Sequence, residues 1–483
     1  MKHFLVLATV ALLSPYHPLV GLLAAVLFGF FLPGFCVLKR LRIQMEGHLL
    51  LAASVVLSVL LSTHALYWGS RLFGYGPESF ALTFVALSLL SYKIDWEFPK
   101  TDLKALAAAA GFFLLMFALF SNTLWVQTSE GVIVGGSNWS DLFAHLPIIQ
   151  SVNQGNFPPQ TPFFAGEPLN YHWFVDFHTA WIAKLTNTEP IGWIRFENAL
   201  YNALLLLMAY TFATRFVKPK TAWIAVVLFL FGGSFAYVHF FEDFAKTPTL
   251  DLIRQHAYDN NWSTFQVPSL MGGYLVVQRP QMIGFAALIL ALILMRDGFP
   301  KRKNEIFAAG LVVGLMAPFQ YFAFGACLVG CAILMVHKSL KEKTRPFTES
   351  VPFLMPLMLA LPFVFPALFV GKTAGFLQFS PLWLAPKDPF GFVWFYLLNF
   401  GLVAILAGLA LARSSVTDKG MLASLALAFF LIPNLATLSG TQWDMAKFFA
   451  YMSFPLSVLA AGWLAERKKA ILAAGLFFSI LTG

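Results

Sequence analysis

The chain has 483 residues, of which 59% are hydrophobic and only 11% charged, and its mean hydropathy is +0.73. Soluble globular domains are far less apolar, so this composition excludes a soluble protein and indicates an all-α, polytopic integral membrane protein. The net charge of +9 does not indicate a nucleic-acid partner, because the basic residues lie in the gaps between apolar runs instead of forming one face or tail.

Apolar runs long enough for membrane-crossing helices recur along the whole chain. An α-helix needs about 17 to 25 apolar residues to cross a bilayer, and most of the runs have that length. We therefore expect about 12 to 15 spans, joined outside the cytoplasm by loops that carry short surface helices. The expected spans before the first long loop cover residues 4–14, 18–38, 48–72, 78–93 and 104–121. Those after it cover residues 190–215, 221–240, 276–295, 305–320, 322–337, 351–370, 391–412, 420–438, 448–465 and 470–483.

The basic residues indicate which loops lie in the cytoplasm. Clusters such as those in residues 39–42, 301–303 and 338–345 fall in alternate gaps between the expected spans. By the positive-inside rule these gaps are cytoplasmic, which places the loop after residue 121 outside. We predict a multi-pass protein of the plasma membrane whose functional face is extracytoplasmic.

Residues 171–186 interrupt the expected alternation of loops. This segment is amphipathic and of marginal length for a span. If it crosses the membrane, the basic residues at 215–220 fall outside, against the positive-inside rule. Either the rule fails there, or the helix lies along the membrane surface or dips partly into it.

The first long outer loop and the helix after it concentrate ionisable residues. In DLFAHLPIIQ, Asp141 and His145 are four residues apart, which places both on one face of a helix. His172 and Asp176 repeat this spacing in the opposite order, and His178 points elsewhere on the same helix. Each pair can supply a general base with its hydrogen-bond partner. The two pairs, Asp141 with His145 and His172 with Asp176, are also candidate ligands for a divalent cation. Alternatively, each pair satisfies itself as a local hydrogen bond.

Further polar positions interrupt the apolar sequence. Glu167 is either a second reactive acid or a solvated loop residue. Arg279 begins an apolar run, where its guanidinium either holds a phosphate by two parallel hydrogen bonds or extends to the membrane interface. Asp444 and Lys447 are three residues apart and either pair with each other or leave the lysine to an anionic ligand. Trp443 is a substrate contact or an interfacial anchor.

The order of features after residue 121 resembles the membrane-embedded glycosyltransferases of the GT-C superfamily, most closely the prokaryotic relatives of the protein mannosyltransferases. The segments GSNWSDLFAHLPIIQSVNQGNFP and FFAGEPLNYHWFVDFHTA carry the resemblance, and QRPQM and TQWDMAKFF add a weaker one. The resemblance implies transfer of a sugar from a polyprenyl-phosphate donor in the membrane to an extracytoplasmic acceptor, by a single inverting displacement. The resemblance does not identify the sugar or the acceptor.

The resemblance also implies roles for individual residues. Asp141 takes the part of the loop acid that acts as a base or metal ligand, with His145 one turn later. The family's adjacent pair of acids is replaced here by Ser140-Asp141, so a second acid falls on Glu167 or Asp176. A divalent cation is the candidate cofactor.

Six side chains are the candidate substrate contacts of such an enzyme. Tyr171 and His172 form the Tyr-His entry into the next helix, and Arg279 and Lys447 are the candidates for binding the phosphate. Trp443 and Asp444 complete the substrate-binding set.

We therefore divide the chain into N-terminal membrane helices (1–104), a GT-C-like core with the first large outer loop (105–215) and the remaining helices of the same domain (216–483). The alternative function is a transporter or flippase of a lipid-linked or small polar solute, in which the Asp and His residues relay protons. Such a protein usually places ionisable residues deep within its spans, whereas here they are concentrated in outer loops. The membrane lipid is the expected partner, and the sequence does not indicate an oligomeric state.

Overall fold

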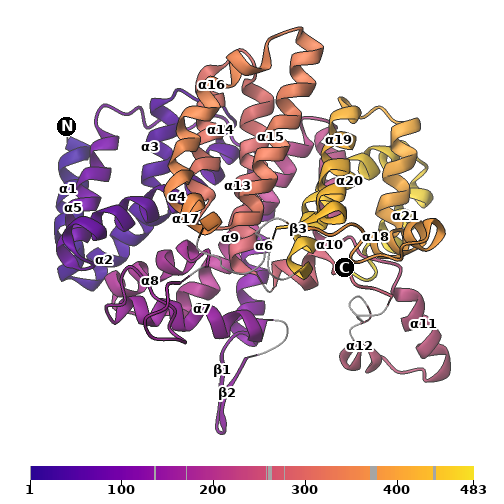
Figure 1. Ribbon diagram of the computed structural model, residues 1–483, viewed down its shortest axis with the longest axis horizontal. Helices are drawn as coiled ribbons and strands as arrows, with labels where there is room; N and C mark the ends of the chain where they lie inside the picture. The colour runs from indigo at the N-terminus through magenta and orange to yellow at the C-terminus, as the bar shows by residue number, and fades with distance from the viewer. Residues whose placement is uncertain are drawn as a thin grey trace. The chain divides into compact units, whose positions relative to one another are not determined.

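A computed structural model describes residues 2–134, 138–169, 171–256, 258, 264–276, 278–369, 378–438 and 442–483 (Figure 1). At residues 2, 138–141, 254–255 and 367–369 it describes the backbone alone. The described residues are helical almost throughout, and their strands form only two short antiparallel pairs. The all-α class expected from the composition is therefore confirmed. The helices group into two compact units, which are residues 1–208 with 278–370 and residues 209–277 with 371–483.

Eight helices among the described residues are long and apolar enough to cross a membrane. They are Pro18–Arg40, Gly47–Phe73, Leu103–Thr123, Arg279–Gly298, Tyr321–Glu342, Pro346–Pro366, Pro389–Ala412 and Gln442–Ala465. Five shorter apolar helices are His3–Tyr16, Pro77–Ser91, Pro219–Phe231, Lys419–Leu435 and Lys469–Ile480. The expected number of spans is therefore reached only if most of the shorter helices also cross.

The N-terminal part of unit 1 consists of helices, most of them joined by short turns, with a longer segment between α5 and α6 (Figure 1). They are α1 (Lys2–Leu13), α2 (Pro18–Ala24), α3 (Leu32–Arg40), α4 (Gly47–Phe73), α5 (Pro77–Ser88) and α6 (Leu103–Thr123). Helix α3 packs on α4 at Gly34, whose backbone N–H donates to Ser58 Oγ over 2.8 Å. A Cβ at Gly34 would lie 2.2 Å from the Ser54 carbonyl oxygen, so only glycine permits this close helix contact.

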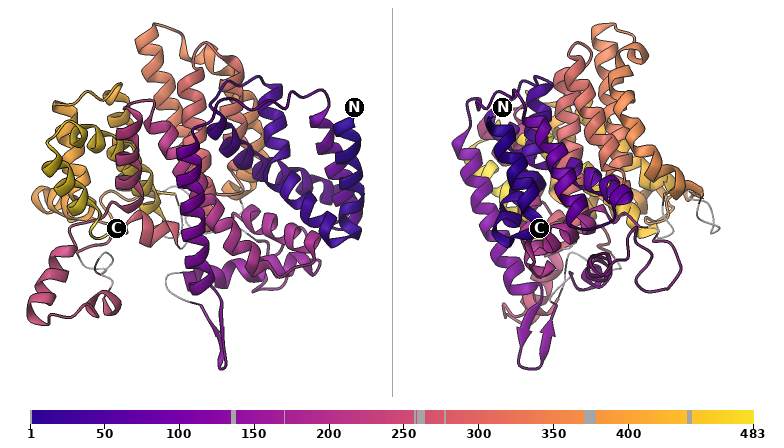
Figure 2. Two further views of the ribbon diagram at one scale, coloured as in Figure 1. Left: turned by 180° about the vertical axis from the view of Figure 1, so that it is seen from behind. Right: turned by 90° about the vertical axis from the view of Figure 1, so that its left-hand side faces the viewer.

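The segment after α6 leads to the elements that carry most of the predicted site. A hairpin of β1 (Val126–Thr128) and β2 (Gly131–Ile133) extends beyond the end of α6 (Figure 2). Helices α7 (Asn138–Asn153) and α8 (Phe174–Thr186) follow and pack against each other, and α9 (Pro190–Ala213) begins four residues after α8. Asn187 ends α8 in the left-handed conformation that commonly terminates a helix.

The structure shows how long the helix in segment 171–186 is and how far it is buried. Helix α8 has 13 residues, so it is about 20 Å long and too short for a hydrocarbon core of about 30 Å. All of its residues except Lys184 are buried, and it packs against α2, α4 and α7. The segment, whose placement the sequence left open, is therefore a buried helix within unit 1, and tertiary packing covers its polar face as well as its apolar one.

Five helices complete unit 1: α13 (Arg279–Gly298), α14 (Lys303–Met316), α15 (Tyr321–Glu342), α16 (Pro346–Leu357) and α17 (Leu361–Phe369). Helix α13 is buried almost all round and packs on α14 and α15. The expected span 351–370 is not one regular helix, because a 3₁₀ turn at Met358–Ala360 separates α16 from α17. Prolines within both helices remove backbone donors and account for this break.

Unit 2 is built around α20 (Lys447–Ala465), which packs on α10 (Pro219–Phe231), α18 (Pro389–Ala412) and α19 (Lys419–Leu435). Helix α18 is kinked at Gly401, whose φ of 59° and close approach to the Gly233 carbonyl require glycine. The remaining elements are α11 (Tyr237–Lys246), α12 (Leu252–Gln255), η4 (Met271–Leu275), β3 (Gln378–Phe379), β4 (Ala436–Thr437), η6 (Gln442–Ala446) and α21 (Lys469–Ile480). The expected span 221–240 therefore ends early, at Phe231.

Candidate functional site

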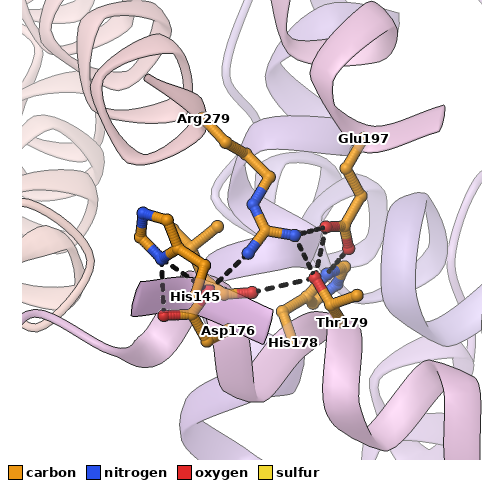
Figure 3. Close-up of polar contacts among 7 residues, drawn as sticks. His145, Asp176, His178, Thr179, Glu197 and Arg279 are labelled. Atoms are coloured by element: carbon orange, nitrogen blue, oxygen red, sulfur yellow. Dashed lines mark hydrogen bonds and ion pairs between the residues drawn. The ribbon is translucent and has the colours of Figure 1, made fainter. Parts of the chain in front are cut away.

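Five ionisable side chains and one hydroxyl converge inside unit 1 from helices α7, α8, α9 and α13 (Figure 3). They are His145, Asp176, His178, Thr179, Glu197 and Arg279. We call this set the buried cluster. Its acidic side chains are 0% exposed, so their charges are compensated by neighbouring protein groups and not by solvent.

Arg279 is the centre of the buried cluster. Its Nη2 donates to Asp176 Oδ1 over 2.5 Å, and its Nη1 donates to Glu197 Oε2 over 2.9 Å and to Thr179 Oγ1 over 2.5 Å. Figure 3 shows the guanidinium between the two carboxylates. Thr179 Oγ1 in turn donates to Glu197 Oε2 over 2.5 Å. The arginine therefore joins the first turn of α13 to α8 and α9.

Asp176 holds a histidine on its other side. His145 Nδ1 lies 2.9 Å from both Asp176 carboxylate oxygens, so this nitrogen carries the proton and donates it. The side chain of His145 is 8% exposed, and its Nε2 has no hydrogen-bond partner among the described residues. A neutral imidazole fixed in this way presents Nε2 as a proton acceptor, with Asp176 setting its tautomer and orientation.

Glu197 holds the second histidine. His178 Nδ1 is 2.7 Å from Glu197 Oε1, and its Nε2 is 3.4 Å from the Gly29 carbonyl oxygen. Both neighbours are acceptors, so both ring nitrogens of His178 face groups to which an N–H can donate. A proton on each would give the ring a positive charge beside Glu197. Two carboxylates, one guanidinium and one imidazolium would then leave the buried cluster without net charge.

The local sequence explains how these side chains meet. Asp176 and Thr179 are three residues apart on α8, so they lie on one face of that helix. Arg279 is the first residue of α13, and Pro280 follows it at the position where a helix needs no backbone donor. Pro147 lies in the middle of α7, two residues after His145.

Three of the predicted site residues come together in this arrangement. His145, Asp176 and Arg279 are connected side chain to side chain, although Arg279 is 103 residues after Asp176. Asp141 lies on the helix α7, as its i, i+4 spacing with His145 predicts, but its side chain lies outside the described residues. The predicted contact between Asp141 and His145 therefore stays a prediction.

The predicted pairing of His172 with Asp176 is wrong. His172 precedes the first residue of α8, so the two residues do not share a helical face, and Asp176 pairs with His145 and Arg279 instead. The His172 ring stacks on the Tyr171 ring at 4.1 Å between centroids and contacts the Tyr321 ring. Tyr171 also lies beside His145, with 5.7 Å between ring centroids.

His178 points elsewhere on α8 than Asp176, as expected, but it contacts Glu197 and so belongs to the buried cluster. The predicted phosphate contact of Arg279 has no support in this arrangement, because the guanidinium is 4% exposed and engages three protein side chains. Extension of Arg279 to the membrane interface is contradicted by the same burial.

The remaining predicted residues lie elsewhere. Glu167 is exposed in a turn, where its carbonyl accepts from the Thr161 backbone N–H. Lys447 Nζ donates to Asp444 Oδ1 over 2.7 Å, which confirms the alternative that these two residues pair. Trp443 packs edge-on against Trp383. Residues 443, 444 and 447 belong to unit 2, whereas the buried cluster belongs to unit 1.

The donor set of the buried cluster does not fit a divalent cation. Asp176 and Glu197 both receive hydrogen bonds from Arg279, whose positive charge opposes a second cation at the same oxygens. Among the described residues, no three His, Cys, Asp or Glu side chains are arranged to hold a metal ion. Asp141 lies outside that search. We therefore derive no step through a metal.

Sequence reasoning missed Thr179, Glu197 and the role of His178. For Glu197 the signal was present, because an acid within the expected span 190–215 is costly unless it faces a partner. For Thr179 no signal existed, since a threonine in an amphipathic segment is common.

Comparison with known proteins places the chain in a family. A family model described as "Uncharacterized membrane protein (DUF2298)" matches residues 19–272, more than half of the chain. No curated protein and no solved structure matches it. The matched region contains every member of the buried cluster except Arg279, which lies seven residues beyond its end. The chain is thus a member of the DUF2298 family of membrane proteins.

Proposed function

We propose that this protein is a membrane-embedded transferase that moves a sugar from a polyprenyl-phosphate donor to an acceptor outside the cytoplasm. The observation that carries the proposal is the imidazole of His145, fixed at Nδ1 by Asp176 with Nε2 left as a proton acceptor. This imidazole lies on α7, in the loop that resembles the catalytic loop of the GT-C glycosyltransferases. The resemblance supplies the reaction class, and the cluster supplies an oriented base.

The proposed reaction needs one proton acceptor and one leaving group. The acceptor hydroxyl gives its proton to the base while its oxygen forms a bond to the anomeric carbon. The bond from that carbon to the phosphate oxygen breaks, and polyprenyl phosphate leaves with the electron pair. The resemblance assigns the base to Asp141, and the geometry adds His145 one helical turn later.

The test is sugar transfer by membranes that contain the full chain and a labelled polyprenyl-phosphate sugar. Positioned general bases typically contribute about 100- to 10,000-fold, so Asp141→Asn or His145→Gln should lower the rate by at least about 100-fold. The matched control is Glu130→Gln, which removes an exposed acid from the same loop and should leave the rate unchanged. Transfer that survives both Asp141→Asn and His145→Gln would contradict the proposal.

A second candidate function is proton-coupled transport, and the burial of the cluster favours it. Asp176, His178 and Glu197 are buried, contrary to the expectation that the ionisable residues gather in outer loops. One turn after Glu197 on α9, the Tyr201 hydroxyl is buried and has no hydrogen-bond partner among the described residues. Tyr201 shares a helix face with Glu197 and interacts with it, so this polar group lies beside the buried cluster.

An assay in proteoliposomes distinguishes the two candidate functions. A transporter takes up or moves its solute in response to a pH gradient, and Glu197→Gln should abolish that response. A transferase releases polyprenyl phosphate without a gradient. Transfer that needs no gradient and stops in His145→Gln supports the transferase, whereas gradient-driven movement without sugar transfer supports the transporter.

A further inference from the structure

A second charged site lies in unit 1, at the ends of helices that the function above does not use. A cavity of about 530 Å³ is lined by Lys39, Arg40, Arg42, Ile43, Lys93, Ile94 and Asp95. The lining comes from the end of α3, from the turn between α3 and α4 and from the segment between α5 and α6. Four of its side chains are cationic and one is acidic, so the cavity has an excess of positive charge.

Two of the cations serve the fold. Arg40 donates from Nε to the Leu90 carbonyl over 3.0 Å and from Nη2 to the Tyr92 carbonyl over 2.8 Å. These bonds satisfy carbonyl groups at the end of α5, where a helix leaves them without partners. Lys39 Nζ donates to the Glu97 carbonyl over 2.8 Å and lies 3.4 Å from Asp95 Oδ2.

Asp95 is itself fixed as an anion. Its Oδ1 accepts from the Glu97 backbone N–H over 3.0 Å. This hydrogen bond, helped by Lys39, lowers the pKa of Asp95. The carboxylate therefore offsets Lys39, and the charges of Arg42 and Lys93 are left without an acidic partner in the lining.

Arg42 and Lys93 are the cations of the lining that the described protein groups do not neutralise. Among the described residues, neither charged group forms a hydrogen bond or an ion pair, and Lys93 Nζ lies 5.4 Å from the centre of the Tyr92 ring. Both residues have left-handed backbone conformations, with φ of 54° at Arg42 and 55° at Lys93. Glycine adopts this conformation at lower cost, so both positions carry a cation where the backbone alone favours a glycine.

The surroundings indicate that the ligand belongs to a lipid. The helices that end at this cavity are apolar, and two of them, Pro18–Arg40 and Gly47–Phe73, are long enough to cross a membrane. Leu89, whose carbonyl accepts from Arg40, is 54% exposed, and Phe98, which follows the Glu97 carbonyl that accepts from Lys39, is 49% exposed. A phosphate in the cavity therefore has apolar surface beside it on which acyl chains can lie, as expected for basic pockets between transmembrane helices.

We propose that this basic cavity binds the phosphate headgroup of an anionic membrane phospholipid, with Arg42 and Lys93 as the ligand-contacting cations. The site is distinct from the buried cluster. Its lining residues come from α3 and the segments around residues 42–43 and 93–95, whereas the cluster comes from α7, α8, α9 and α13, so the two sites share no residue. The proposal therefore does not depend on sugar transfer.

The experiment measures binding of labelled phosphatidylglycerol to the purified full-length chain in detergent, with phosphatidylcholine as the neutral competitor. The test variant is Arg42→Gly with Lys93→Gly, which removes both charges and suits both backbone conformations. The matched control is Lys343→Gln with Arg345→Gln. Lys343 is also exposed with a φ of 54°, but neither residue lines the cavity.

The test variant should bind phosphatidylglycerol about 10- to 30-fold more weakly, because each cation near a lipid headgroup contributes about 1 kcal/mol. The control variant should bind it as the unmodified chain does. Because glycine fits both turns, a folded test variant is expected, and its elution on size exclusion checks this directly. Equal losses in both variants, or no preference for phosphatidylglycerol, would overturn the proposal.

A further arm distinguishes lipid from free phosphate. Inorganic phosphate and glycerol phosphate share the headgroup charge but lack acyl chains, so at the lipid's concentration they should not displace it. Displacement by inorganic phosphate alone would show a site for a soluble anion and would contradict the lipid assignment.

Discussion

In each unit of the protein, a buried polar side chain joins segments that are distant in the sequence. This side chain is charged in unit 1 and neutral in unit 2. In unit 1, Arg279 joins α13 to α8 and α9 through Asp176, Thr179 and Glu197. In unit 2, the neutral amide of Asn399 on α18 has the same structural role. Its Oδ1 accepts from the backbone N–H groups of residues 266 and 267, and its Nδ2 donates to the carbonyls of residues 264 and 395.

The comparison shows what the fold alone requires. Asn399 is 4% exposed and connects its segments without burying a charge. Arg279 also connects its segments, but its guanidinium and the two carboxylates are removed from water. The desolvation free energy is several kcal/mol per ion before the ion pairs compensate for it. A neutral link would be enough to hold helices together. The ionic link in unit 1 is therefore more costly than a structural link needs to be, and the proposed function would give its titratable side chains a use.

The largest expected effect comes from removing the centre of the buried cluster. Arg279→Gln leaves Asp176 and Glu197 buried with too little compensation, and breaking a buried pair in this way costs about 3–5 kcal/mol. Thermal unfolding of the purified chain in detergent measures the loss. Arg345→Gln, which removes an exposed arginine from the same unit, should change stability by no more than about 0.5 kcal/mol. Equal melting temperatures for Arg279→Gln and the unmodified chain would show that the carboxylates do not depend on Arg279.

The neutral link should cost less to break. Asn399→Ala removes the acceptor of two backbone N–H groups, one of them on buried Val267, and each unsatisfied buried group costs about 1–3 kcal/mol. We expect a loss of about 2–3 kcal/mol, again from thermal unfolding in detergent. Asn304→Ala is the control, because the Asn304 side chain donates a single hydrogen bond at an exposed position. A loss at Asn399 larger than at Arg279 would reverse the comparison between the two units.

The link between His145 and Asp176 can be measured by a double-mutant cycle. The single variants His145→Gln and Asp176→Asn each break the contact between His145 Nδ1 and the carboxylate, so their effects on stability should not add. We expect a coupling energy of about 2 kcal/mol between them, within the range seen for residues in one network. The pair His145 with Glu130, an exposed residue of the hairpin turn, serves as the control and should couple by less than about 0.5 kcal/mol. A coupling near zero for His145 and Asp176 would mean that the carboxylate does not orient the ring.

The sequence predicts the helices better than the contacts between them. Apolar length and loop charge were enough to place α4, α6, α13 and α15 close to their observed bounds. They left segment 171–186 undecided, because the amphipathic pattern of a short surface helix is the same as that of a short helix buried against polar partners. Hydropathy gives the amount of apolar surface but not what covers the polar face.

The candidate site shows the same limit. Asp176 and His145 were recognised as reactive because polar residues are rare in this chain, yet the sequence paired Asp176 with its near neighbour His172. The actual partners of Asp176 are 31 and 103 residues away, and no local spacing specifies such contacts. The buried position of Glu197 was predictable from its cost within a span, whereas its partner Arg279 was not.

The smallest expected effect tests whether the charges or the hydroxyl dominate the buried cluster. Thr179→Val keeps the shape of the side chain but removes the donor to Glu197 and the acceptor for Arg279. Because these two charged groups still bond to each other, the variant should lose only about 1 kcal/mol in thermal unfolding. Thr179→Ser keeps the hydroxyl and should retain the network, apart from the loss of one buried methyl group. If Thr179→Val destabilises the protein as much as Arg279→Gln does, the hydroxyl and not the ion pairs holds α8 to α9, and the contrast with the neutral link of unit 2 disappears.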